Sequence, residues 1–243
     1  MLESVSKTSC HLSAEQVSLL CSFLCNRLKE ESHSFQGILR ILRVIVSQAS
    51  IPGALVSSIF SRLINDISIQ TLEADERSLL FQLIFSLLDK YFDVLKPSDP
   101  DSINHTLDEE KDQDLNKLYI LIISCISSSS TNEETMSVAL QCILYLMEDK
   151  SCSKILGNNL SSILPSLLRQ CQPDRGLKTR INSLNCISKC SKCLPEKVLL
   201  PHKKMVVKQL QTTLDDRKRL VRKSAAEASH EWILLGQPGN AQK

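Results

Sequence analysis

The sequence predicts an all-α protein built as a right-handed α-solenoid of HEAT repeats, with about five antiparallel helix pairs. Aromatic residues make up only 4% of the 243 residues and there are six glycines, a composition typical of packed helices and not of a strand-rich sandwich. Two segments repeat at an offset of 42 residues, and a period of about 40 to 47 residues is that of HEAT and armadillo repeats. No strand-like alternation persists long enough to predict a sheet.

Matching acidic and basic residues define this repeat. Asp174 and Arg180 in the first segment correspond to Asp216 and Arg222 in the second. We expect each Asp to cap the second helix of its pair, and each Arg to reach toward the Asp of a neighbouring repeat. The helical wheel places Arg222 on the inner side of its helix, as it does Arg180. These four residues are predicted to form a structural ladder between repeats.

Helical periodicity and turn signals divide the chain into pairs of helices, which we expect to form one domain over residues 1–243. Pro52 and Gly53 separate the first two pairs. The segment 95–112 is polar, acidic and contains proline, so we expect a mobile loop between repeats. Gly236, followed by Pro238 and Gly239, is expected to end the last helix. The expected repeats span roughly 13–48, 52–94, 113–149, 158–193 and 195–235.

The second helices of the fourth and fifth pairs carry polar stripes on the helical wheel. In stacked helical pairs the second helices usually line the concave surface, so the stripes are candidate docking surfaces; a merely solvated helix face has the same pattern. The inward arc of the fourth pair's second helix is predicted to hold Leu177, Ile181, Leu184, Ile187 and Leu194. The predicted partner-binding residues are Lys178, Asn182, Asn185, Lys189, Lys192, Arg219 and Lys223.

The net charge of +2 conceals an asymmetry between the two ends of the chain. Residues 1–150 carry 12 Lys and Arg against 21 Asp and Glu, a balance of −9, and residues 151–243 carry 17 against 6, a balance of +11. The basic end could meet an acidic protein surface or nucleic acid. The run from Arg217 to Lys223 is a candidate nuclear-import or nucleic-acid patch. Leu220 and Val221 interrupt it, and stacking aromatics are missing around it, so pairing between repeats is the favoured interpretation.

The spacing of Cys186, Cys190 and Cys193 admits two interpretations. Cys-x3-Cys-x2-Cys is also the cluster-binding signature of radical enzymes that use S-adenosylmethionine, but that signature needs a loop at the mouth of a barrel. On a helix the same spacing places three small, burial-prone side chains on one stripe, and this packing role is favoured. The histidines are scattered, and there is no glycine-rich phosphate loop or activated nucleophile. We therefore expect no metal, no cofactor and no enzyme activity, and no apolar run is long enough to span a membrane.

The end of the chain, from Leu214 to Asn240, resembles the ending of the Mms-nineteen family. These proteins are long HEAT-repeat adaptors of the cytosolic iron–sulfur protein assembly machinery and are linked to nucleotide excision repair. The resemblance is specific over roughly 25 residues and looser back to Leu160; because family members are several times longer, the chain resembles their C-terminal domain. The matching pieces are Leu214-Asp215-Asp216, Lys218 to Lys223, Glu231-Trp232, Leu234-Leu235-Gly236 and Pro238-Gly239.

This resemblance implies a non-enzymatic adaptor. Similar proteins form a targeting complex with a WD-repeat propeller subunit and a small assembly subunit, and their C-terminal repeats dock on both. The complex delivers clusters to apo-proteins such as DNA-repair helicases and polymerases, which implies a location in the cytoplasm and nucleus. A helical-repeat protein that binds nucleic acid through its basic C-terminal end is the alternative, and a protein that carries a cluster on its cysteine stripe is a third possibility.

Overall fold

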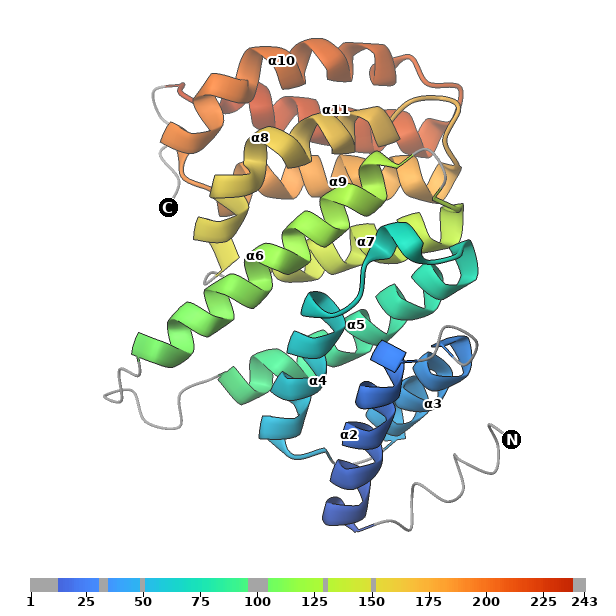
Figure 1. Ribbon diagram of the computed structural model, residues 1–243. Coiled ribbons are helices and arrows are strands. Elements are labelled where there is room, and N and C mark those ends of the chain that lie inside the picture. Colours follow the sequence, from blue (N-terminus) through green and yellow to red (C-terminus); the bar gives the residue numbers. More distant parts are fainter. Residues whose placement is uncertain are drawn as a thin grey trace. The chain divides into compact units, whose positions relative to one another are not determined.

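The computed structural model describes residues 13–30, 35–48, 51–95, 105–128, 131–149 and 152–237. Over these ranges the chain forms α-helices and one short 3-10 helix, Ile69–Thr71, with no strand (Figure 1). The predicted all-α repeat fold is confirmed, and the helices follow one another as five consecutive pairs. They are α2 (Ala14–Glu30), α3 (Phe35–Gln48), α4 (Gly53–Asn65), α5 (Ala74–Leu95), α6 (His105–Ser127), α7 (Glu133–Leu146), α8 (Ser153–Gln170), α9 (Leu177–Cys193), α10 (Glu196–Leu214) and α11 (Arg219–Leu234).

Local signals in the sequence explain several helix ends. At the start of α2, the Ser13 hydroxyl accepts a hydrogen bond from the Gln16 amide at 3.3 Å, while the Ser13 amide donates to the Gln16 side chain at 2.9 Å. This reciprocal arrangement is a capping box. Asn132 caps α7 by accepting from the Thr135 amide at 2.8 Å. After α11, Gly236 has φ 74°, a left-handed conformation that ends helices and suits glycine.

The charge-rich segment 95–112 is not a loop throughout, so the prediction for it was wrong in part. Helix α6 begins at His105, and residues 105–112 are its first turns. Acidic residues are favourable near a helix N-terminus because they interact with the helix dipole, so an acidic composition is compatible with a helix start as well as with a loop. Residues 96–104 lie outside the described residues, as do Pro238 and Gly239.

The chain divides into two compact units, Met1–Lys117 and Leu118–Lys243, with the boundary inside α6. In the first unit, α5 packs against α3 and α4, and α2 packs against the same two helices. The Phe60 and Tyr91 rings stack at 4.1 Å between α4 and α5. Asp114 of α6 accepts hydrogen bonds from Ser61 and, at 3.3 Å, from Asn65. These contacts hold α6 against α4 at Asp114.

The second unit consists of successive helical hairpins. The second helices of three pairs, α7, α9 and α11, lie side by side, and α8 packs against both α9 and α10 (Figure 1). The core between these helices is aliphatic, with buried cysteine and small polar side chains on α9. Trp232 of α11 is fully buried and donates its indole N–H to the Ile187 carbonyl of α9 at 2.9 Å. Burial of one hairpin's apolar face against the next is what stabilises a repeat array.

Candidate functional site

Helices α9 and α11 carry the predicted partner-binding stripe, and they start in equivalent registers. Leu177 begins α9 and Arg219 begins α11, which reproduces the offset of 42 residues seen in the sequence. Asp174 and Asp216 each lie three residues before their helix, and Arg180 is the fourth residue of α9, as Arg222 is of α11. The four predicted ladder residues therefore occupy matching places in the two hairpins.

A buried ion pair joins these two hairpins. The Arg180 guanidinium donates to the Asp216 carboxylate, and the two side chains are 8% and 2% exposed. Asp216 also accepts a hydrogen bond from the Lys218 amide at 2.8 Å, and Arg222 donates to the Asp216 carbonyl at 2.7 Å. One carboxylate thus fixes the turn before α11 and holds that turn against α9.

The expected helix-capping role is not found for Asp216, because α11 starts after Lys218 without a side-chain cap. The other two ladder residues also differ from the prediction. Asp174 is 69% exposed, and the ion-pair contact found for it is with its neighbour Arg175 at 3.6 Å. Helix α9 starts after Gly176 without a side-chain cap, so the capping role expected of Asp174 is wrong. Arg222 is exposed and not on the inner side of its helix. The described residues include no later hairpin whose Asp it could meet.

The predicted stripe is divided into a neutralised half and an unpaired half. Lys189 bonds the Glu148 carboxylate at 2.7 Å, and Lys192 pairs with Glu231 at 3.3 Å. Lys223 lies 3.8 Å from Glu227. Each of these lysines has an acidic partner within the fold, so its charge is partly neutralised and less available to a partner protein. Of the seven predicted partner-binding residues, all of which the structure describes, Lys178, Asn185 and Arg219 are exposed without such a partner, and Asn182 is half-buried.

The basic run at the start of α11 does not form a surface suited to stacking with bases. Val221 is fully buried, and Leu220, which follows Arg219, is exposed. Trp232, the one tryptophan of the chain, is fully buried and hydrogen-bonded, so it cannot stack on a base.

The cysteine stripe lies inside helix α9 and not in a loop. Cys186 and Cys190 are fully buried and Cys193 is half-buried. Burial raises the pKa of all three thiols, because a thiolate is poorly solvated there. The ligand form of cysteine is the thiolate. No group of His, Cys, Asp or Glu among the described residues could hold a metal ion.

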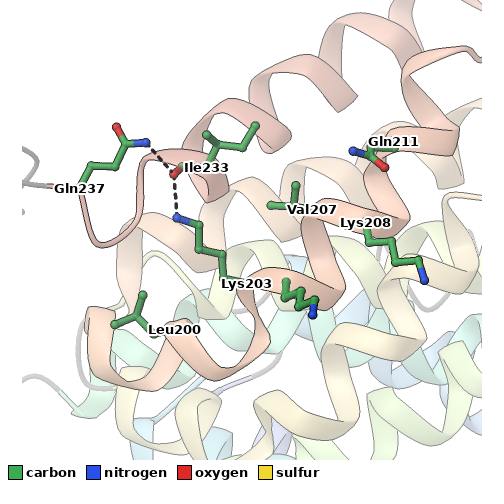
Figure 2. Close-up of a pocket in the computed structure, with 8 residues that line it drawn as sticks. Leu200, Lys203, Val207, Lys208, Gln211, Ile233 and Gln237 are labelled. Atoms are coloured by element: carbon green, nitrogen blue, oxygen red, sulfur yellow. Dashed lines mark hydrogen bonds between the residues drawn. The ribbon is translucent and has the colours of Figure 1, made fainter.

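A second surface, which sequence reasoning missed, lies on the last hairpin. It is an open groove between α10 and the C-terminal end of α11 (Figure 2). The signal that could have revealed it is a stripe at helical spacing on α10, in which Leu200 and Val207 are seven residues apart and lysines lie beside them. The lining residues are Leu200, Lys203, Lys204, Val207, Lys208, Gln211, Ile233 and Gln237.

Comparison with known proteins connects the chain to one family. A family model of MMS19 N-terminal type, described as "Dos2-interacting transcription regulator of RNA-Pol-II", matches residues 1–115. The MMS19 nucleotide excision repair protein homolog of Xenopus laevis is 32% identical over 150 residues, which is 60% of this chain and 14% of that protein. The Mus musculus homolog is 48% identical over 64 residues, or 26% of this chain and 6% of that protein. The Dictyostelium discoideum homolog is 26% identical over 169 residues, which is 64% of this chain and 15% of that protein.

These matches support a relationship to the MMS19 family, and the chain spans only a small part of its relatives' length. The match to an N-terminal-type model is not what a C-terminal resemblance implies, so the chain's place within a full-length relative stays a prediction.

Solved structures with a similar fold are designed armadillo-repeat proteins. One has a TM-score of 0.57 at 12% identity and covers 95% of this chain and 91% of its own. Another, computationally designed for modular peptide recognition, has a TM-score of 0.60 at 12% identity, with the same coverage. At this identity the likeness shows the fold alone. No helix in the described part of the chain is long and apolar enough to cross a membrane.

Proposed function

We propose that this chain is a non-catalytic, protein-binding segment of an MMS19-type scaffold. The observation that carries the proposal is the pair of stacked second helices, α9 and α11, which are locked by the buried Arg180–Asp216 pair and present exposed basic residues. Rigid helical repeats with a broad exposed face are suited to holding other proteins. The relatives are named as nucleotide excision repair proteins, which supports a role in DNA repair.

The proposed partners follow from the resemblance of the C-terminal run, Leu214 to Asn240, to the ending of that family. They are the WD-repeat propeller subunit and the small assembly subunit of the cytosolic iron–sulfur targeting complex. Through them the chain would help to deliver clusters to client proteins such as DNA-repair helicases and polymerases, in the cytoplasm and nucleus. In this proposal the cluster chemistry takes place on other subunits.

A double charge reversal tests the docking surface directly. We choose Lys178→Glu/Arg219→Glu because these two exposed residues have no acidic partner within the described fold, so the variant breaks no internal ion pair. Binding to the two purified partner subunits should weaken by about tenfold or more, because opposed charges at an interface select the partner. Circular dichroism should show native helicity. Unchanged affinity for both subunits would reject this surface.

Direct nucleic-acid binding is the second candidate, favoured by the balance of +11 over residues 151–243 and by the exposed basic residues at the start of α11. Its signature is a steep fall of DNA affinity with salt, because contacts to phosphates release counterions. A flat or absent DNA signal at low salt would exclude it.

A further inference from the structure

The groove on the last hairpin shares no residue with the partner-binding stripe described above. It has a volume of about 650 Å³ and is open to solvent. We propose that it binds an acidic amphipathic helix of a partner protein. This inference rests on the proposed scaffold function, and it adds a second surface with a partner of stated chemistry.

The groove occupies the face that the preceding hairpin uses for packing. Helix α8 begins at Ser153 and α10 at Glu196, so equivalent positions are 43 residues apart. Three pairs of equivalent residues are buried in both helices, which confirms this register. They are Leu156 and Leu199, Ile163 and Val206, and Leu167 and Leu210.

A second set of positions is buried in α8 but lines the groove in α10. In α8 all three are leucines, and that helix packs against α10. In α10 two of the three are polar. This face therefore differs from the α8 face, which is apolar at all three positions and is buried. The pairs are Leu160 and Lys203, Leu164 and Val207, and Leu168 and Gln211.

The lining combines an apolar strip with positive charge. Leu200 and Ile233 are 44% and 43% exposed, and Val207, which also lines the groove, is half-buried. Lys204 and Lys208 stand exposed beside them, and none of the eight lining residues is acidic. Apolar residues at helical spacing accept the apolar face of an incoming helix. Lysines along the same strip select acidic residues on that helix.

The walls of the groove are held together by internal hydrogen bonds. Lys203 donates to the Ile233 carbonyl at 2.8 Å (Figure 2). It also donates to the Leu235 carbonyl at 2.6 Å, and the two bonds tie α10 to the end of α11. The Gly236 amide donates to Glu196, so the glutamate of α10 is engaged outside the groove. The site is formed before a partner arrives, and this reduces the ordering cost of binding. From Leu200 to Gln211 the strip measures about 16 Å at 1.5 Å per residue, enough for three turns of a partner helix.

Two other occupants fit the chemistry less well. A second copy would bring the same lysines to the same face, and like charges across an interface are repulsive. Nucleic acid would place phosphates over the lysines, but the apolar side chains of the strip make no favourable contact with phosphates. No aromatic side chain lines the groove to stack with bases.

The test uses a synthetic helical peptide of about four turns, with leucines on one face and glutamates on the other. Its binding is measured by fluorescence anisotropy. A peptide with lysine in place of glutamate is the matched control, and it should bind at least about tenfold more weakly. Lys204→Glu/Lys208→Glu should weaken the acidic peptide by about tenfold or more, as should Ile233→Ser through the apolar strip. Lys178→Glu/Arg219→Glu should leave peptide binding unchanged.

Each contrary outcome overturns the proposal. Equal binding of both peptides, or no effect of Lys204→Glu/Lys208→Glu at native helicity, removes the selection for acidic residues. Preferential binding of single-stranded DNA would assign the groove to nucleic acid, and self-association abolished by the same variant would assign it to a second copy. If the partner subunits lose affinity for Lys178→Glu/Arg219→Glu while the acidic peptide binds Lys204→Glu/Lys208→Glu as tightly as the unchanged chain, the scaffold function stands and the groove proposal fails.

Discussion

Hairpins α8–α9 and α10–α11 share one plan, yet the same register positions have different environments in them. At the offset of 42 residues between α9 and α11, three positions are buried in α9 and exposed in α11. Of the extra ones in α9, Arg180 meets Asp216 of the following hairpin, so a residue's role depends on its neighbour as well as on its wheel position. The three pairs are Arg180 and Arg222, Leu184 and Ala226, and Ser191 and Ile233.

The largest expected contrast is between the two equivalent arginines. Arg180→Ala leaves the Asp216 carboxylate buried without its guanidinium partner, and breaking a buried pair in this way costs about 3–5 kcal/mol. Arg222→Ala removes hydrogen bonds from an exposed side chain to backbone carbonyls and should cost less than about 1 kcal/mol. Urea denaturation followed by circular dichroism measures both variants. Equal losses of stability would contradict the comparison.

Truncation of equivalent aliphatic residues in α8 and α10 gives the next contrast. Leu164 is fully buried, and Leu164→Ala should destabilise the chain by about 3 kcal/mol through lost transfer energy and a cavity. Val207 lines the open groove, so Val207→Ala should cost about 1 kcal/mol or less. Thermal unfolding of the two variants tests this. A Val207→Ala loss as large as that of Leu164→Ala would mean that the groove is part of the core.

The fold could be predicted from the sequence because helix ends and repeats are marked by local sequence signals. Pro52, Asn132 and Gly236 mark helix ends, and the Asp-x5-Arg spacing found the repeat register between α9 and α11. The prediction of a loop over 95–112 was wrong for residues 105–112, which belong to α6, because composition alone does not separate a loop from the start of a helix.

The inner face of α9 was harder to predict. Leu177, expected inside, is 37% exposed, while Cys186 and Cys190 are fully buried. A second helix touches its own partner and both neighbouring hairpins, and small side chains allow those close contacts, so hydrophobicity on one wheel does not locate the face. The groove was not predicted for a related reason: its lining comes from two helices, and a wheel shows only one. The partner-binding stripe stays a prediction.

Trp232 gives a smaller effect at the junction of the two hairpins. It holds in α11 the position that Cys190 holds in α9, and both are fully buried. Trp232→Phe keeps an aromatic ring but removes the N–H that bonds the Ile187 carbonyl, at a cost of about 1–2 kcal/mol. Urea denaturation measures the loss. A change within experimental error would show that the hydrogen bond contributes nothing to the packing of α11 on α9.

The smallest expected effect comes from the exposed ion pair that joins the same two helices. Lys192 and Glu231 approach to 3.3 Å, but their side chains are 59% and 36% exposed. Solvent screens such a pair, and holding two long side chains in one geometry costs entropy, so its coupling energy should be about 0.5 kcal/mol or less. A double-mutant cycle with Lys192→Ala and Glu231→Ala, measured at low and at high salt, isolates this term. The coupling should vanish at high salt, where exposed charges are screened. A coupling that approaches the loss in Arg180→Ala would mean that the surface charges, and not the buried pair, hold α9 and α11 together.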